Sequence, residues 1–525
     1  MASDNVKLLA NLPEAVGAIS LQFSSNTPHA YVSTLKAVQV YDIANPAAPR
    51  LVGVAPLVNY QNEAMSLGER PNGDKFLIIA SNEAIVSPDG TTATNNRHAV
   101  VVEVTDPTNP KVVGDTPTMT RTHTIFCGTP TCEYAYSDGR TQGAMSIIDL
   151  RDFRNPKMAN IYRSVVPSGH DEDLDDAGIL WHVGGQGSVA LDISKPRQPV
   201  PLDSTDADGV ASDDYTGKPY NNFIHHNSLR PNARSFRQTR GSNGRLTSGT
   251  PSLRRGNVLL VTEEDYLQIS PNVGQCGGYE GSFQTWHVPY LHAGQYAKDN
   301  PNGQAGKGTM RSLDRWNTEL LESKTTTPAG AFCSAHYFDY NQPGFVAQGW
   351  YQQGTRILDV RDPRNIKQVG YFFTGAMETW AAYWVPVRNG RGQVTDKSSN
   401  LVYTVDAVRG IDATRVGLPS DQSPRAPSPS APRSCRSGWR ARRPSPPAPA
   451  RSGAGCAAWP PKGLRQLGRS SSRRRAIGQA PDEVLHRTVW VNSATGSWTL
   501  RKETPASSPS STTAACDSWS QNPRP

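Results

Sequence analysis

One short unit recurs along this chain and restricts what it can fold into. Each copy has a β-branched strand, an acidic residue near the end of that strand, a turn punctuated by proline, and a second strand. Proline fixes its φ angle and donates no backbone hydrogen bond, so these prolines mark the turn between two antiparallel strands. The unit therefore predicts repeated β-hairpins. Five copies are clear: VQVYDIANPAAPRLVG, VVVEVTDPTNPKVVG, MSIIDLRDFRNPKMAN, SVALDISKPRQPVPLD and TRILDVRDPRNIKQVG.

The acidic residue of each copy lies one position before the last apolar residue of the first strand. At this position a carboxylate can accept hydrogen bonds from the N–H groups of the turn. We therefore expect these residues to stabilise turns and to take no part in chemistry. They are Asp42, Glu103, Asp149, Asp192 and Asp359.

Two further copies are degenerate, and the two ends of the repeat region complete one of them. GSFQTWHV is followed much later by NTELLES, whereas GIDATRV at 410–416 has no partner strand after it. NVKLLANLP at 5–13 has the pattern of a second strand without a first, so pairing it with 410–416 would remove two exposed edges. Each unit also carries an innermost strand and its neighbour, and seven of each are found. The prediction is an all-β, seven-bladed β-propeller over residues 1–416, closed by the N-terminal strand.

The units VYDI…P…P…LVG, IIDL…NP and ILDV…DPR…QVG resemble the LVIVD repeat family, over about residues 1–416. Members of that family are bacterial β-propeller proteins that are often exported. The resemblance implies a propeller fold and an extracellular or cell-envelope location, and it implies no particular activity. The N-terminus MASDNVKLL has no charged and then apolar signal segment, so export would require that a leader has been removed, and a cytoplasmic location stays open.

Residues 417–525 differ from the repeat region in composition. They contain 17 Lys and Arg against 5 Asp and Glu, which leaves 37 against 41 for the preceding residues. All of the net positive charge of +8 therefore belongs to this tail, and the propeller has no basic stripe for nucleic acid. Pro, Arg, Ser and Ala dominate the tail, which offers little apolar area against the entropy of ordering. We expect either a disordered extension or translation in a shifted reading frame.

Six of the innermost strands begin with a side chain that can bind a metal. Equivalent positions of successive blades lie around one ring, so these residues would meet at the mouth of the central channel. Imidazoles and carboxylates are ligands for Zn, Cu, Fe, Ni or Mn. The sequence thus predicts a divalent transition metal there, whereas the alternative is a hydrated channel whose side chains satisfy backbone groups. The candidates are Glu63, His123, His170, His225 or His226, His336 and Glu378.

Two acidic segments lie near the same strands. VTEEDY contains Glu263, Glu264 and Asp265 at the far end of a neighbouring strand, and one of them could be a ligand or a general base for metal-bound water. The alternative is a set of solvated loop carboxylates. HDEDLDDAG has aspartates at alternate positions, partly like a calcium loop, but the twelfth position holds His182 in place of the bidentate glutamate.

Four cysteines in the repeat region suit disulfides. The run CGTPTC crosses a Gly/Pro turn, so a bridge between Cys127 and Cys132 is sterically plausible, and Cys276 and Cys333 flank a long insertion that they could staple. The alternative is four reduced thiols in a cytosolic protein.

Three functions remain open, and the third is protein interaction through residues 417–525 if that tail is translated in frame. The first is an exported binding or scaffold module, acting as a monomer, with a small molecule, a metal or a protein at the propeller rim. The second is a metal-dependent oxidase or hydrolase that uses the histidine and glutamate ring. The sequence has no nucleophile elbow, no phosphate-binding glycine loop, no nucleotide or flavin signal, and no apolar stretch of 18 residues that could span a membrane.

Overall fold

The computed structural model divides into two compact units, Met1–Pro429 and Ser430–Pro525. The structure describes residues 1–57, 63–81, 84–86, 93–95, 98–118, 122–138, 142–185, 187–205, 224–264, 281–301, 308–319, 333–419, 487–492 and 498–503. In the second unit, β32 (Arg487–Asn492) and β33 (Trp498–Glu503) form an antiparallel hairpin. The other predictions for residues 420–525 lie outside the described residues.

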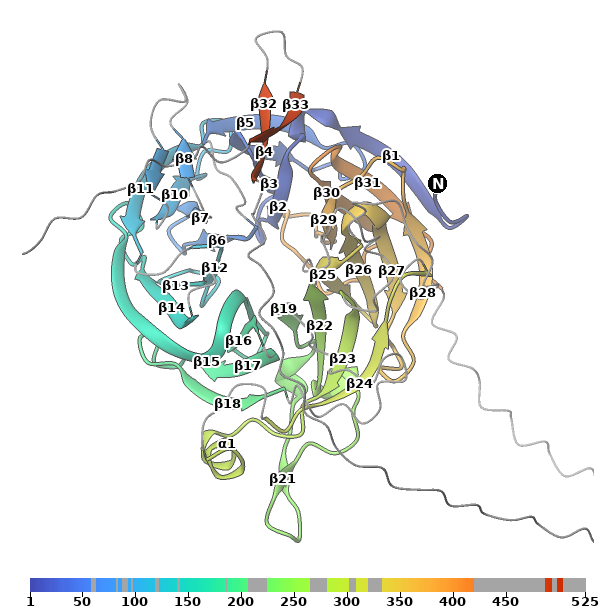
Figure 1. Cartoon of the computed structure of the whole chain (residues 1–525). Helices are drawn as coiled ribbons and strands as arrows, with labels where there is room; N and C mark the ends of the chain where they lie inside the picture. The colour runs from blue at the N-terminus through green and yellow to red at the C-terminus, as the bar shows by residue number, and fades with distance from the viewer. Residues whose placement is uncertain are drawn as a thin grey trace, which may run out of the picture. The chain divides into compact units, whose positions relative to one another are not determined.

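The first unit is built almost entirely from four-stranded antiparallel arrays (Figure 1). The first three arrays are β2 (Ala18–Phe23), β3 (His29–Thr34), β4 (Ala37–Asp42) and β5 (Arg50–Pro56); β6 (Met65–Glu69), β7 (Lys75–Ser81), β10 (His98–Glu103) and β11 (Lys111–Pro117); and β12 (Thr124–Cys127), β13 (Tyr134–Asp138), β14 (Gln142–Asp149) and the first part of β15 (Lys157–Leu174). The short strands β8 (Ala84–Val86) and β9 (Ala93–Asn95) pair between β7 and β10.

The chain continues in the same way. The next arrays are the last part of β15 with β16 (Ile179–Gly184), β17 (Gly187–Asp192) and β18 (Val200–Ser204); β19 (Ile224–Leu229), β22 (Val258–Glu264), β23 (Phe283–His287) and β24 (Arg311–Trp316); β25 (Ala335–Asn341), β26 (Phe345–Trp350), β27 (Gly354–Asp359) and β28 (Lys367–Phe372); and β29 (Thr379–Trp384), β30 (Leu401–Asp406) and β31 (Gly410–Val416), on which β1 (Val6–Leu12) lies. Connections carry β20 (Thr239–Arg240), β21 (Leu246–Thr247), α1 (Ala293–Asp299) and the short 3₁₀ turns Pro13–Ala15, Ala233–Ser235, Leu253–Arg255 and Tyr351–Gln353.

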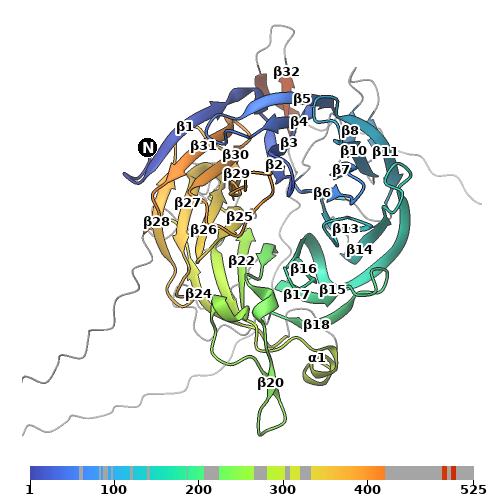
Figure 2. The ribbon, with the colours of Figure 1, turned by 180° about the vertical axis from the view of Figure 1, so that it is seen from behind.

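The arrays surround one centre, with their first strands inside and their last strands outside (Figure 1, Figure 2). This arrangement of antiparallel arrays is a β-propeller. Strand β1 pairs antiparallel with β31, from Val6 opposite Val416 to Leu12 opposite Ile411. One detail differs from the sequence prediction, because the predicted outer strand of the third unit and the predicted inner strand of the fourth are one continuous strand, β15, which serves both arrays.

Two positions of the repeat motif, the acidic residue and the glycine, make contacts that the structure explains. The carboxylates of Asp42 and Asp192 accept hydrogen bonds from backbone N–H groups two residues further on, which confirms their expected role in turns. Gly53, the glycine of the first LVG, lies against the turn of the following copy, and a Cβ atom there would stand 2.1 Å from the carbonyl oxygen of Pro107. Gly114 meets the carbonyl of Arg154 in the same way. The motif therefore fits one array to the next.

Apolar side chains fill the spaces between neighbouring arrays. Val38 and Val40 of the first array pack with Leu77 and Ile79 of the second, and similar clusters lie between later neighbours. The same holds for the last and the first arrays, whose buried residues form one cluster. Its members include Leu12, Ala18, Leu21, Tyr41, Tyr403, Val405 and Ile411. Burial of such side chains is the main favourable contribution to folding.

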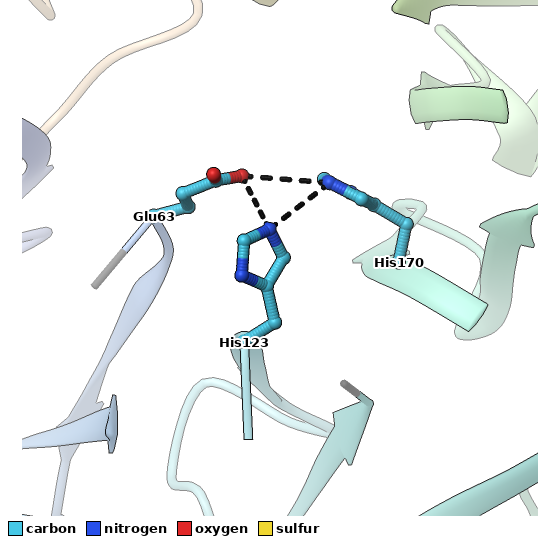
Figure 3. A group of neighbouring side chains, drawn as sticks. All are labelled: Glu63, His123 and His170. Atoms are coloured by element: carbon cyan, nitrogen blue, oxygen red, sulfur yellow. Dashed lines mark hydrogen bonds and ion pairs between the residues drawn. The ribbon is translucent and has the colours of Figure 1, made fainter. Parts of the chain in front are cut away.

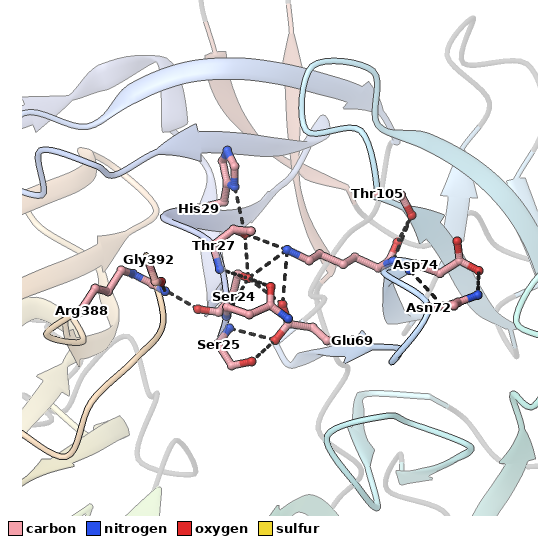
Figure 4. A network of polar contacts seen from close by, with 12 residues as sticks. Ser24, Ser25, Thr27, His29, Glu69, Asn72, Asp74, Thr105, Arg388 and Gly392 are labelled. Carbon is pink, nitrogen blue, oxygen red and sulfur yellow. Dashed lines mark hydrogen bonds and ion pairs between the residues drawn. The ribbon is translucent and has the colours of Figure 1, made fainter. Parts of the chain in front are cut away.

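Polar contacts join the first, second and last arrays near the ends of their innermost strands (Figure 4). The carboxylate of Glu69, at the end of β6, accepts a hydrogen bond from the Ser24 hydroxyl at 2.6 Å and lies 3.6 Å from the Lys75 ammonium. The guanidinium of Arg388, which follows β29, donates to the carbonyl of Ser24 at 2.6 Å. This network links the first two arrays to the last. No helix among the described residues has the length and apolar character needed to cross a membrane.

We predict that two of the three leucines of β1, Leu8 and Leu12, contribute very differently to stability. Leu12 is 8% exposed and packs between the last and first arrays, whereas Leu8 is 40% exposed. Leu12→Ala should lower the free energy of unfolding by about 2 to 3 kcal/mol. Leu8→Ala should lower it by less than about 1 kcal/mol. Urea denaturation of the full chain, followed by circular dichroism, measures both; equal effects would contradict the pairing of β1 with β31.

Candidate metal centre

Side chains from five consecutive arrays converge at the starts of their innermost strands. Glu63 lies two residues before β6, and His123 directly precedes β12. His170, His226 and His336 lie within β15, β19 and β25. Figure 3 shows Glu63, His123 and His170 pointing toward one another from three separate elements. The five residues, which we call the histidine ring, were all predicted from the sequence as candidates.

One carboxylate oxygen lies among the four imidazoles. Oε2 of Glu63 is 2.8 Å from Nε2 of His123, 3.5 Å from that of His170, 3.5 Å from that of His226 and 3.6 Å from that of His336. The Nε2 atoms of His123 and His170 are 3.1 Å apart. The atoms form two overlapping sets, Glu63 with His123 and His170 and Glu63 with His226 and His336, and within each set the ligand atoms lie within 4.8 Å of one another.

β-Bulges direct most of the histidines inward. The strand register shifts around His170 in β15, His226 in β19 and His336 in β25. A bulge adds one residue to a strand and re-aims its side chain. The equivalent shifts in the remaining two arrays carry Ile19 and Trp380, which pack together with Tyr351 in an apolar cluster. The centre therefore has donors on one side and an apolar wall on the other.

The histidine ring is buried and its charges are unevenly distributed. Glu63 is 3% exposed and the imidazoles are at most 1% exposed. Burial lowers the pKa of His226 to about 3, so this ring is neutral at pH 7. Burial alone would raise the pKa of Glu63, but the charge of His123 and its close contact with the carboxylate hold this pKa well below its usual range. An ionised carboxylate thus lies beside at least one neutral imidazole, the form that binds metals.

A backbone carbonyl fixes which nitrogen of His336 is free to bind. Nδ1 of His336 lies 2.6 Å from the carbonyl oxygen of Trp380. A carbonyl can only accept, so Nδ1 carries the proton and the lone pair of the neutral ring is on Nε2. Among the described residues, Nε2 of His336 and both ring nitrogens of His226 have no hydrogen-bond partner. The two Nε2 atoms point into the space around Glu63.

Glu264 extends the histidine ring on one side. Its Oε2 is 3.8 Å from Nε2 of His170, and its Oε1 accepts a hydrogen bond from the Tyr351 hydroxyl at 2.8 Å. Burial and the charge of Glu264 raise the pKa of Tyr351 well above its usual value, so this hydroxyl keeps its proton. Glu263 instead accepts from the Ser282 hydroxyl at 3.0 Å, and Asp265 lies outside the described residues.

The structure does not bring the two other sequence candidates into the histidine ring. His225 lies beside Trp286, with ring centroids 5.6 Å apart, and its Nδ1 is 2.8 Å from the Ser188 hydroxyl. Glu378 is half-buried and accepts a hydrogen bond from the indole of Trp380 at 3.2 Å. Trp380, two residues later, lies in the bulge that corresponds to the bulge at His226. The sequence prediction therefore placed the inward-pointing position of this strand two residues too early.

The cysteine candidates fall into two groups. Cys127 and Cys132 are joined by a disulfide across the turn between β12 and β13. Cys333 is also disulfide-bonded, whereas Cys276 lies outside the described residues.

The segment HDEDLDDAG forms the end of β15 and a turn, so it is no calcium loop. The carboxylate of Asp175 is 2.7 Å from the Arg230 guanidinium and accepts from the indole of Trp181 at 3.0 Å, which leaves it engaged in a buried ion pair. A second group of buried donors, Asp138, Glu172 and His182, was missed by the sequence reading. Only the register of β15 against β16 brings Glu172 opposite His182, and no spacing rule could have shown this.

Comparisons with known proteins assign the chain to no family. No family model matches it, and no curated protein matches it significantly. Solved structures that match the chain include the β-propeller domain of Cps50 (Swd1) from Myceliophteria thermophila, at 11% identity and a TM-score of 0.46 over 78% of this chain and 100% of that chain. The RRP9 WD40 repeats align at 8% identity and a TM-score of 0.44 over 79% and 98%. U3-55K aligns at 7% identity and a TM-score of 0.44 over 79% of this chain and 99% of that chain. The description of the fold therefore rests on the strand pairing of this chain.

Proposed function

We propose that the propeller is a metal-binding protein and that the histidine ring holds one divalent transition-metal ion. The observation that carries this proposal is the convergence of four Nε2 atoms to within 2.8–3.6 Å of a single carboxylate oxygen of Glu63. Buried nitrogens of His226 and His336 lack hydrogen-bond partners among the described residues, and such groups are costly unless a ligand satisfies them.

The distances suit a common coordination sphere. Imidazole and carboxylate ligands lie about 2.0 to 2.2 Å from such metals, so two neighbouring ligand atoms stand about 3 Å apart. The Nε2 atoms of His123 and His170 are 3.1 Å apart, and Oε2 of Glu63 is 2.8 Å from the first of them. A set rich in imidazole, without thiolate, favours Cu, Zn, Fe, Ni or Mn over Ca or Mg. The carbonyl of Trp380 would orient His336 toward the ion.

A metal-dependent enzyme is a second candidate, favoured by the pair of Glu264 and Tyr351. A bound metal supplies Lewis acidity, or redox chemistry if it is Cu or Fe. Glu264 reaches to 3.8 Å from His170 and could accept a proton beside the metal, while the Tyr351 hydroxyl holds its other oxygen in place. On the side lined by Ile19 and Trp380, the part of the chain that the structure describes offers no protein ligand. An oxidase or a hydrolase would need this open side.

We also propose the finer architecture and the setting that the sequence predicted. The pairing of β1 with β31 and the apolar cluster between the last and first arrays support a closed ring of seven blades. The repeat supports membership of the LVIVD family, and the disulfide between Cys127 and Cys132 supports export, because disulfides persist in oxidising compartments. A small molecule or a protein at the rim would then be the partner of a monomeric module.

The adjacent histidines 225 and 226 offer a matched test of the metal. Both are fully buried, but only His226 belongs to the histidine ring. The full chain is stripped with a chelator, reloaded with Zn²⁺ and freed of excess metal. We expect His226→Ala to lower the bound zinc by one equivalent per chain, as measured by plasma mass spectrometry.

His225→Ala is the control, since it removes the same volume from the neighbouring position and should leave the zinc content unchanged. Equal zinc content in the wild type and both variants would contradict the proposed centre. Circular dichroism of each variant checks that it is folded.

The enzyme candidate predicts an open coordination position. Azide added to the Cu²⁺-loaded full chain should produce a new charge-transfer absorption band, because a small anion can occupy a position that the protein leaves free. The expected band should persist in Tyr351→Phe, which removes no ligand. An unchanged spectrum at saturating azide would contradict the enzyme candidate and leave the binding proposal intact.

A further inference from the structure

A second cluster of ligand-type side chains lies between the third and fourth arrays. Asp138 ends β13, Glu172 lies in the last part of β15, and His182 lies in β16. Glu172 and His182 face each other across the antiparallel pair of β15 and β16. One ligand atom from each of the three residues lies within 4.8 Å of the other two. None of these residues belongs to the histidine ring.

The two nitrogens of His182 face two carboxylates. Nε2 is 3.4 Å from Oδ2 of Asp138, and Nδ1 is 3.4 Å from Oε1 of Glu172. All three side chains have 0% exposure. Neither nitrogen of His182 has a hydrogen-bond partner among the described residues, and Glu172 has at most a weak contact from the Thr124 hydroxyl. Burying polar atoms without hydrogen-bond partners destabilises a protein, so these atoms suit a bound ligand.

The backbone leaves room for this cluster. A Cβ atom on Gly169 would stand 1.7 Å from Oδ2 of Asp138, so any larger residue at that position would expel the carboxylate. Gly169 lies in β15 at the register shift that also directs His170 inward. One irregularity in β15 therefore serves both the histidine ring and the cluster behind it.

Charge favours a cation over water as the missing ligand. Burial raises the pKa of Glu172 well above its usual value, so this carboxyl keeps its proton beside a water molecule and ionises only when a cation binds. No lysine or arginine pairs with Glu172 in the part of the chain that the structure describes. Buried charges are stable when they are paired or bind a metal.

We propose that Asp138, Glu172 and His182 form a second divalent-cation site, separate from the histidine ring. One imidazole nitrogen and two carboxylate oxygens suit Zn²⁺ or Mn²⁺, whereas Ca²⁺ prefers oxygen ligands only. The ion would join β13 of the third array to β15 and β16 of the fourth. Its role is structural, because the three side chains are fully buried.

Zinc content of the full chain separates this site from the histidine ring. We expect Glu172→Gln and His182→Asn each to lower the bound Zn²⁺ by one equivalent relative to the wild type. The double variant His226→Ala/His336→Ala should lower it by one equivalent, and combination with Glu172→Gln should lower it by two. Asp203→Asn is the matched control, since Asp203 is a fully buried carboxylate that Thr309 and Ser204 satisfy, and it should lose no zinc.

A second measurement does not depend on the folding of the Glu172 and His182 variants. Zn²⁺ added to the chelator-treated variant His226→Ala/His336→Ala should still raise its thermal unfolding midpoint, because the second site is intact in that protein. Unchanged zinc content in folded Glu172→Gln and His182→Asn would overturn the second site, as would the absence of any zinc-dependent stabilisation in the double variant. Loss of zinc in these two variants but not in the double variant would instead overturn the histidine ring as a metal site.

Discussion

Face-to-face packing of the four-stranded arrays is the constraint on which the rest of the first unit depends. Both faces of each array are apolar, and their side chains fill the spaces between that array and its two neighbours. Gly53 and Gly114 of the repeat lie against the turns of the following copies and allow the outer strands to approach. Rigid packing of this kind holds the starts of the innermost strands at fixed positions around one centre. Residues far apart in sequence thus become neighbours there.

That geometry buries a carboxylate and several imidazoles at one centre, where the surrounding side chains do not fully balance the negative charge. An ionised Glu63 lies among imidazoles that are fully buried, and burial keeps His226 neutral. The nearest imidazole is that of His123, whose Nε2 is 2.8 Å from the carboxylate. A divalent ion would accept the lone pairs of the neutral imidazoles and would also balance the negative charge of the carboxylate. The same reasoning applies to the smaller cluster of Asp138, Glu172 and His182.

Much of the fold followed from the sequence, because proline turns and β-branched strands repeat at matching offsets. The strand pairs that these units predicted are present, and so is the pairing of 5–13 with 410–416. Five of the candidate metal ligands at the strand starts lie close together, because a propeller brings equivalent positions of its arrays to one centre. The choice between His225 and His226 could not be made, because it depends on a bulge that no local pattern reveals. The same limit misplaced Glu378 relative to Trp380, and the cluster at His182 needed the register of two strands.

The most direct test of the account is the location of a metal in crystals of the full chain. Crystals grown with Zn²⁺ would be measured on both sides of the zinc absorption edge, and an anomalous difference map would locate the ion. We predict a peak within about 2.0 to 2.2 Å of a carboxylate oxygen of Glu63 and of the Nε2 atoms of at least two of His123, His170, His226 and His336. A well-ordered histidine ring without an anomalous peak, with the imidazoles hydrogen-bonded to water or to Glu63, would contradict it.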